Sequence, residues 1–252
     1  MGTVTGRPDQ MTCLVWYKGA MNQGVTRRGC VIVPAFREGG RIGPVVTAIL
    51  PYVPSVLVVD DGSPDDTAGE SERAGAIVIR HATNLGKGAA LDTGFQAARE
   101  RGFDFVITMD GDGQHAASDL PSFLEARARG GYPVLVGSRM AEVSTMPPVR
   151  RAVNRLMSWV LSREMGQLVP DTQCGFRLYE LAVVPEVSAA SKRFAAESES
   201  LLELSESGIR IGSVPITTIY GTEVSKIRPV RDTVRFIAML LQYRRRRKIR
   251  AG

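Results

Sequence analysis

The sequence predicts an α/β protein in which a mostly parallel sheet carries helices on both faces. Two observations predict it. From residue 29 onward, short continuous apolar runs alternate with amphipathic segments, and several of the runs end directly on carboxylates or glycines. Strands that alternate with helices form parallel sheets, and the helices cover both faces. The chain has 252 residues, enough for one large domain or two small ones, and its 44% hydrophobic and 23% charged residues are ordinary for a globular protein.

Each element follows from its own residues. Apolar runs closed by proline, glycine or acids predict buried strands, at residues 29–36, 55–62, 76–81, 103–115 and 133–140. The segments between them predict helices, at residues 39–50, 63–75, 86–102 and 118–131. The helix of 63–75 is expected to start with Ser63 as its cap and to end on glycine.

Acidic residues follow two of these strands, where a parallel sheet binds its ligands. Asp60 and Asp61 close the strand of "SVLVVDDG", and Asp110 and Asp112 close that of "FDFVITMDGDGQH". Asp110 and Asp112 can both point at one cation, and Gln114 adds a third oxygen. Oxygen ligands without sulfur suit Mg²⁺ or Mn²⁺. A solvated Asp-Gly turn is the alternative, but the second acid pair favours a metal site.

The segment "NLGKGAA" places glycines and Lys87 at the start of a helix. Free backbone N–H groups there can bind an anion. The spacing matches neither a P-loop nor the dinucleotide-binding fingerprint. A tight turn with a surface lysine is the other interpretation.

Charge and cysteine content exclude several classes of protein. The net charge is +6, and the run 244–248 with Arg250 alone carries six positive charges. The rest of the chain is therefore balanced, and we expect no nucleic-acid partner. Three widely spaced cysteines argue against disulfides and indicate a reducing cytoplasm, with Cys174 expected to be packed. We find neither a membrane span nor a signal peptide.

Several segments resemble family 2 glycosyltransferases, which have the Rossmann-like GT-A fold. "VIVPAFREGGRI", "VLVVDDGSPDDT", "HATNLGKGAALDTGF" and "ITMDGDGQH" resemble the donor half of that family. "VGSRM", "DTQCGFRLY", "FAAESESLL" and "VPITTIYGTEVSKIRPVRDTVRF" resemble the branch that makes polyprenyl-phosphate sugars, including dolichyl-phosphate glucose and mannose synthases. The resemblance covers residues 29–240 and depends on the order of its pieces.

The resemblance implies roles for individual residues. Pro34 and Glu38, with Asp60 or Asp61, match positions that hold the nucleotide base and ribose. A further set matches the metal and diphosphate site: Asp110, Asp112 and Gln114 as ligands, with Lys87 for charge compensation.

On the acceptor side, Arg139 and Arg151 match arginines that grip the acceptor phosphate, a role for which a planar guanidinium is well suited. A hydroxyl acceptor would instead need a carboxylate base. Glu197, Glu199 and Asp171 are the candidates for that base, although Glu197 and Glu199 can equally form a polar helix face.

These roles imply an inverting, metal-dependent transfer of a hexose from UDP-glucose or GDP-mannose to a polyprenyl phosphate, in synthesis of the cell envelope. A second hypothesis is transfer to a hydroxyl of a polysaccharide or glycolipid. The third is a phospho-receiver signalling domain, because "VLVVDDG" resembles a receiver's acid pair. Receivers, however, are about half as long as this chain and carry the pair on their first strand.

We expect three regions along the chain. Residues 1–28 are a poorly ordered tail, residues 29–231 are the GT-A domain, and residues 232–252 are an amphipathic helix with a basic end. In that helix Phe236, Met239, Leu240 and Tyr243 recur at helical spacing. A basic amphipathic helix can lie on an anionic membrane surface. We therefore expect peripheral association with the inner face of the cytoplasmic membrane, alone or through a membrane-protein partner.

Overall fold

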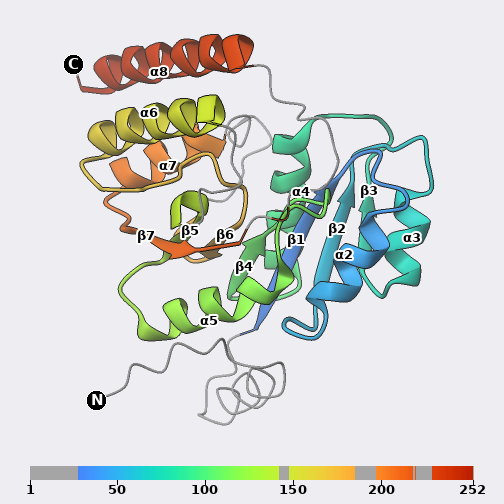
Figure 1. The fold of residues 1–252 in the computed structure, drawn as a ribbon. Coiled ribbons are helices and arrows are strands. Elements are labelled where there is room, and N and C mark those ends of the chain that lie inside the picture. Colours follow the sequence, from blue (N-terminus) through green and yellow to red (C-terminus); the bar gives the residue numbers. More distant parts are fainter. Residues whose placement is uncertain (1–27, 142–147, 185–196, 218, 220–228, 252) are drawn as a thin grey trace.

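The computed structural model describes residues 28–141, 148–184, 197–217, 219 and 229–251. The predicted tail, apart from Arg28, lies outside the described residues. Figure 1 shows the two ends of the molecule, with α2 (Ile42–Ile49) and α3 (Thr67–Arg73) on one side. The stacked helices α6 (Pro148–Met165), α7 (Glu197–Glu206) and α8 (Pro229–Ala251) lie on the other side.

The described residues contain a seven-stranded sheet of order β3-β2-β1-β4-β6-β5-β7. Its strands are β1 Gly29–Ala35, β2 Val56–Asp60, β3 Ile77–Arg80, β4 Phe105–Thr108, β5 Val134–Ser138, β6 Arg177–Glu180 and β7 Ile211–Pro215. All pairs are parallel except those of β6 with β4 and β5. The prediction of a mostly parallel sheet is confirmed, while β6 and β7 had not been predicted.

The described helices cover this sheet on both faces. They are α2 Ile42–Ile49, α3 Thr67–Arg73, α4 Lys87–Glu100, α5 Leu120–Arg129, α6 Pro148–Met165, α7 Glu197–Glu206 and α8 Pro229–Ala251, with 3-10 turns at Ala117–Asp119 and Arg139–Ala141. A Cβ on Gly94 of α4 would lie 2.5 Å from Ile32 Cγ2. Val33 follows Ile32 in β1. A Cβ on Gly111 would lie 3.4 Å from Val33 Cγ1 and 3.3 Å from Ile42 Cδ1 of α2, so Val33 faces α2. Successive strand residues face opposite sides, so α4 and α2 lie on opposite faces.

The start of α3 differs from the prediction. The helix begins at Thr67 with Asp66 at its N-cap position, and Ser63 is not a cap. Instead, the Ser63 hydroxyl accepts the backbone N–H of Arg37, and its own N–H donates to Asp60. Ser63 therefore connects the loops that follow β1 and β2 through its hydrogen bonds. Because its hydroxyl is bound there, it does not cap the helix, which begins four residues later at Thr67.

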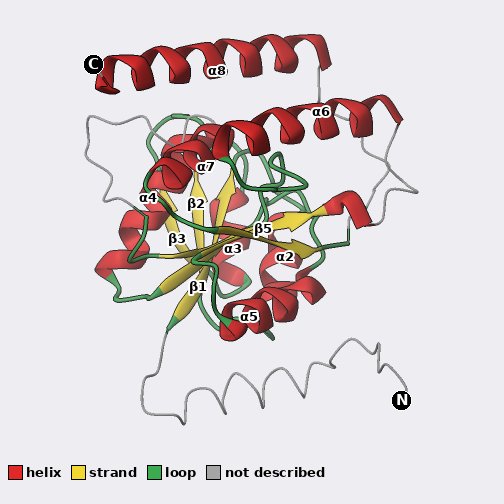
Figure 2. Ribbon diagram, turned by 90° about the vertical axis from the view of Figure 1, so that its left-hand side faces the viewer, coloured by secondary structure: helices red, strands yellow, loops and turns green. Residues whose placement is uncertain are grey.

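A second layer is formed by α6, α7 and α8, of which α8 is outermost (Figures 1 and 2). A small apolar cluster joins them, made of Leu161, Leu202 and Tyr243 with Met165, Phe236, Met239 and Leu240 around it. The four apolar positions predicted for the last helix therefore do share its inward face. None of the helices among the described residues is long and apolar enough to cross a membrane.

Candidate active site

The carboxyl end of β2 carries a buried acid pair. Asp60 is fully buried, and its Oδ1 accepts the N–H of Ser63 at 2.9 Å. Its Oδ2 lies 3.1 Å from the guanidinium Nε of Arg80 at the end of β3. The register pairs Ala35 with Asp60, so β1 and β2 end at the same level. Asp60 therefore stands at the edge of the sheet where a ligand would enter.

Asp61 holds the loop that leads into α4. Its Oδ1 accepts the N–H of Leu85 at 2.9 Å, and its Oδ2 accepts that of Gly86 at 2.7 Å. His81 Nδ1 lies 2.7 Å from Oδ1, and its Nε2 lies 2.9 Å from the Thr93 hydroxyl. Burial raises the pKa of Asp61, but these hydrogen bonds outweigh it and leave the pKa below its usual value. The Asp61 carboxylate thus connects the end of β2 to His81 after β3 and to the loop before α4.

Glycine is required where these two loops touch. Gly62 has a φ of +70°, and a Cβ there would lie 2.6 Å from the backbone carbon of Thr83. The turn after β2 consequently lies directly against the segment that precedes "NLGKG". This close approach explains the Asp-Asp-Gly order, because a side chain on Gly62 would push the segment at Thr83 and Asn84 away from the acid pair.

Asp110 meets Lys87 beyond the end of β4. Lys87 Nζ lies 2.6 Å from Asp110 Oδ1, and His115 Nε2 lies 3.6 Å from Oδ2. Burial raises the pKa of Asp110, yet the Lys87 charge and the His115 hydrogen bond hold it well below its usual range. Lys87 directly follows Gly86, so Asp61 indirectly positions the cation that faces Asp110. The structure thus brings Lys87 to Asp110 and links Asp61 to the residue before Lys87.

The segment "DTQCGF" closes over this pair. A Cβ on Gly175 would lie 3.0 Å from Asp110 Oδ2 and 3.2 Å from Lys87 Nζ. The carbonyl of Gly175 accepts the hydroxyl of Thr108 at 2.8 Å. Cys174 beside it is fully buried, as expected, and burial raises the pKa of its thiol to about 12. Cys174 is therefore a packed core residue. Gly175 has no side chain, so no Cβ lies against the Asp110 carboxylate.

The predicted ligands of a divalent cation share one loop. Asp110 and Asp112 supply carboxylates and Gln114 an amide, and the N–H of Gln114 donates to Asp112 Oδ1 at 3.0 Å. Within the described residues no group of three or more His, Cys, Asp or Glu side chains could hold a metal ion. Two carboxylates and the space beside Gly175 still fit a hard cation that takes its remaining ligands from substrate phosphates and water.

The end of β1 and the loop that follows it carry two residues predicted to hold the nucleotide base and ribose. Pro34 is the sixth residue of β1, and Glu38 is buried 2.9 Å from Arg41 Nε. The N–H of Glu38 donates to the Thr67 hydroxyl. Arg37 between them has a left-handed φ of 57°, which is rare for a residue with a side chain. Sequence reasoning did not single out Arg37, His81 or Arg80, because their roles depend on loops that meet in space.

Arg139 and Asp171 form a buried pair. The Arg139 Nε and one terminal nitrogen lie 2.7 and 2.9 Å from the two Asp171 oxygens. Asp171 is fully buried and Arg139 is 8% exposed. The assignment of Arg139 to the acceptor phosphate stays a prediction, and so does the assignment of Asp171 as a base. In the structure each side chain is directed at the other.

The remaining acceptor-side candidates lie on the helical layer. Arg151 is partly exposed near the start of α6, and Ser158 further along that helix accepts the N–H of Thr172 at 2.9 Å. Glu199 of α7 accepts a hydrogen bond from Arg246 of α8 at 2.7 Å. Glu197 begins α7, and its side chain lies outside the described part of the chain.

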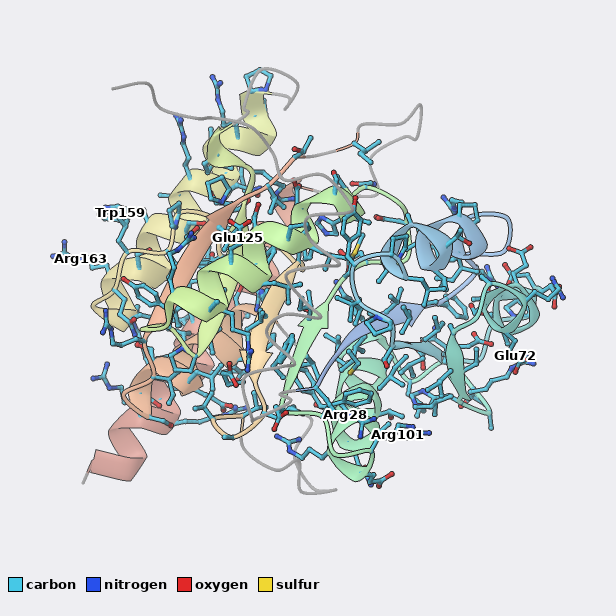
Figure 3. The ribbon with its side chains drawn as sticks, turned by 90° about the horizontal axis from the view of Figure 1, so that it is seen from below. Arg28, Glu72, Arg101, Glu125, Trp159 and Arg163 are labelled. Carbon is cyan, nitrogen blue, oxygen red and sulfur yellow. The ribbon has the colours of Figure 1, made fainter. Side chains whose placement is uncertain are left out.

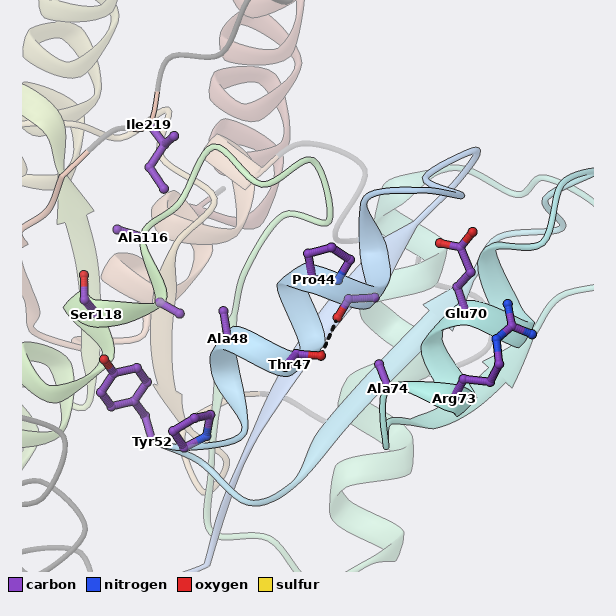
Figure 4. Close-up of a pocket in the computed structure, with 13 residues that line it drawn as sticks. Pro44, Thr47, Ala48, Tyr52, Glu70, Arg73, Ala74, Ala116, Ser118 and Ile219 are labelled. Carbon is purple, nitrogen blue, oxygen red and sulfur yellow. Dashed lines mark hydrogen bonds between the residues drawn. The ribbon is translucent and has the colours of Figure 1, made fainter.

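A cavity of about 890 Å³ lies elsewhere, along α2 and α3 (Figure 4). Its lining includes Pro44, Thr47, Tyr52, Glu70 and Arg73. None of the acids at the strand ends contributes to it. We place the candidate site at the carboxyl edge of the sheet, where the charged groups converge, because this groove gathers no comparable set of polar side chains.

Comparisons with known proteins give consistent results. The family model described as glycosyl transferase family 2 matches residues 30–187. The UDP-N-acetylglucosamine–dolichyl-phosphate N-acetylglucosaminyltransferase of Methanococcus voltae is 32% identical, over 79% of this chain and 88% of that protein. The polyprenol monophosphomannose synthase of Mycolicibacterium smegmatis is 30% identical, over 76% of this chain and 77% of that protein.

Solved structures share the fold. The glucosyl-3-phosphoglycerate synthase of Mycobacterium tuberculosis, crystallised with Mn²⁺, UDP and phosphoglyceric acid, superposes with a TM-score of 0.70. The superposition covers 95% of this chain and 84% of that one, at 20% sequence identity. At this identity the likeness concerns the fold alone.

Proposed function

The chain belongs to glycosyl transferase family 2, and on this premise we propose that it transfers a hexose from a nucleotide-sugar to a polyprenyl phosphate with inversion of configuration. Its fold is the GT-A fold, and it is a glycosyltransferase. One observation carries the proposal: Lys87, Asp110 and Gly175, from three distant segments, converge beside the acid pair at the carboxyl edge.

The donor half of the site suits a nucleoside diphosphate. Glu38 and Asp60 would accept hydrogen bonds from the base and ribose, with Pro34 lining the entry. Asp110, Asp112 and Gln114 would hold Mg²⁺ or Mn²⁺, and this cation would neutralise charge on the leaving diphosphate. Lys87 adds a second positive charge, and Asp61 keeps it in place through the loop before α4. These residues together stabilise the leaving group and orient the anomeric carbon.

The acceptor half suits a phosphate better than a hydroxyl. A lipid phosphate is already an anion and attacks without a strong base, whereas a hydroxyl must lose its proton. The described carboxylates that could take the proton, Asp171 and Glu199, both hydrogen-bond to arginines. The arginines bind both oxygens of Asp171 and one oxygen of Glu199. Arg151, and Arg139 if it exchanges partners, would bind the acceptor phosphate.

The donor is UDP-glucose or GDP-mannose in this proposal. The names of the relatives extend the range of donors worth testing to UDP-N-acetylglucosamine. Transfer to a hydroxyl in polysaccharide or glycolipid synthesis is the alternative. The receiver hypothesis loses its basis, because the acid pair ends the second strand here and the chain belongs to a transferase family.

We place the enzyme at the inner face of the cytoplasmic membrane, in synthesis of the cell envelope. Its acceptor would be embedded there, and no helix among the described residues can span the bilayer. Association would then be peripheral, directly or through a membrane protein.

A donor scan tests the proposal. Purified protein with Mn²⁺ or Mg²⁺ is mixed with vesicles that carry a polyprenyl phosphate, and UDP- and GDP-sugars are supplied in turn. Release of nucleoside diphosphate together with sugar in the lipid phase, for one donor and only with the lipid phosphate present, is the expected result. Donor hydrolysis without labelled lipid would contradict the acceptor and direct attention to Asp171, Glu197 and Glu199.

A further inference from the structure

Helix α6 has two different faces. Asn154, Ser158 and Leu161 are buried toward the domain. Val149, Leu156 and Trp159 are 64%, 59% and 59% exposed. These three recur at intervals of seven and three residues, which places them on one side of the helix. Figure 3 shows Trp159 and Arg163 at the outer edge of the molecule, directed away from the sheet. A soluble surface rarely leaves such a row of large apolar side chains uncovered.

The same side is strongly basic. Arg155 and Arg163 are exposed one turn before and one turn after Trp159. The Arg163 guanidinium lies 5.9 Å from the centre of the Trp159 ring. The only acid in α6 is Glu164, which already binds Arg244 of α8. We call this surface, made of Val149, Leu156 and Trp159 with Arg155 and Arg163, the outer face of α6.

In contrast to the exposed arginines of α6, three arginines at the basic end of α8 form ion pairs within the protein. Arg244 and Arg246 form ion pairs with Glu164 and Glu199, and Arg247 lies 3.5 Å from Glu206. Phe236, Met239, Leu240 and Tyr243 of α8 belong to the apolar cluster with α6 and α7. Three basic residues of the tail and the four apolar positions predicted for this helix are therefore directed at α6 and α7.

We propose that the outer face of α6 docks on an anionic lipid surface, an inference that rests on the proposed lipid-phosphate acceptor. Trp159 and Leu156 would enter the interfacial zone, where tryptophan is favoured, while Arg155 and Arg163 bind lipid headgroups. A second copy of the chain fits less well, because a symmetric contact would bring the arginines of both copies together. Anionic lipid matches both the apolar row and the excess of positive charge.

This docking mode connects the membrane to the site. The opposite side of α6 holds the "DTQCGF" loop through Ser158 and Thr172, and Arg151 lies near the start of the same helix. With its outer face on the lipid, α6 would hold the "DTQCGF" loop on its side away from the bilayer. A phosphate at the membrane surface then lies within reach of Arg151.

Vesicle sedimentation without any acceptor tests the proposal. One variant is Trp159→Ala with Leu156→Ser, and a second is Arg155→Gln with Arg163→Gln. The matched control is Ile237→Ser with Leu241→Ser on α8, where exposure is similar at 49% and 51%. Vesicles are phosphatidylcholine with or without phosphatidylglycerol.

The first variant should bind anionic vesicles about tenfold more weakly. The second should lose about fivefold per arginine, and only on anionic vesicles. The control should stay within about twofold of the unmodified protein. All variants should transfer sugar to a short, water-soluble prenyl phosphate at the unmodified rate, since no substituted residue belongs to the site.

Two results would overturn the docking proposal. One is that the α8 control loses vesicle binding while both α6 variants keep it. The other is that the α6 variants break a dimer in light scattering and bind vesicles normally. Failure of the proposed function looks different: no prenyl phosphate accepts sugar, yet vesicle binding still depends on the outer face of α6.

Discussion

The donor half of the molecule, β1–β4 with α2–α4, holds its acid pair after β2 in a different way from the acids of the acceptor half, β5–β7 with α6–α8. Besides their side-chain contacts with Arg80 and His81, Asp60 and Asp61 accept backbone N–H groups, from Ser63, Leu85 and Gly86. The acids of the acceptor half are held by arginine side chains, as in the pairs Asp171–Arg139, Glu199–Arg246 and Glu164–Arg244.

This difference has a functional meaning. A carboxylate bound by backbone N–H groups is fixed as firmly as the loop itself, which suits a preorganised nucleotide site. An arginine pair can exchange its carboxylate for a phosphate, because both are bidentate acceptors. The donor half is therefore a rigid ligand site, and the acceptor half is a set of replaceable contacts.

The largest expected effect tests the rigid half. Asp112→Asn removes a charge without changing volume, so it should reduce transfer by about a thousandfold or more while the fold persists. Turnover and melting temperature would be measured together, with Asp66→Asn, an exposed acid bound to Arg73, as the control. Turnover near that of the unmodified protein would remove Asp112 from the proposed metal site.

Substitutions at Gly40 and Gly62 distinguish the cost of backbone strain from the cost of a steric clash. Gly62 and Gly40 both have positive φ, +70° and +81°, but only Gly62 is crowded, and nothing lies within 4 Å of a Cβ on Gly40. Gly40→Ala should reduce the free energy of unfolding by about 1 kcal/mol, and Gly62→Ala by about 3 kcal/mol or more. Urea unfolding measures both. Equal losses would mean that the turn after β2 does not depend on its contact with Thr83.

The pH dependence of stability tests Asp61. Its folded pKa lies below its usual value, so its hydrogen bonds stabilise the protein fully above about pH 4 and are lost as pH falls further. Asp61→Asn should reduce the free energy of unfolding by about 2 kcal/mol at pH 7. The gap from the unmodified protein should narrow as pH falls below about 4.

Asp66→Asn serves again as the comparison for that titration. If the difference in the free energy of unfolding between Asp61→Asn and the unmodified protein stays constant with pH, the prediction fails. Asp61 is then not stabilised as an anion by Leu85, Gly86 and His81.

The smallest effect is expected in the acceptor half. Arg246→Gln breaks the contact with Glu199, in which the arginine is 56% exposed. Exposed pairs contribute little, so the melting temperature should fall by less than about 3 °C. The neighbouring exposed Arg245→Gln is the matched control. A much larger drop for Arg246→Gln alone would show that these pairs are structural, and the proposed contrast between the halves would fail.

The sequence by itself determined the donor half. Continuous apolar runs closed by proline, glycine or acids predicted β1 to β5. The acids that follow β2 and β4 were expected at one edge, because the carboxyl ends of parallel strands meet there. Helix α6 gave no single apolar stripe, since Met157 and Leu161 are buried while Leu156 and Trp159 are exposed. The short strand β6 also carried no alternation from which it could be recognised.

Tertiary structure alone decided what each charged group faces. Gly175 lies beside Asp110, Arg139 is bound to Asp171, and Arg244 and Arg246 of α8 pair with acids of α6 and α7. A periodic pattern reports whether a residue is buried, because burial repeats with the turn of a helix or the pleat of a strand. It does not report which distant segment supplies the partner, since that depends on how β6 enters the sheet and on how the helices stack.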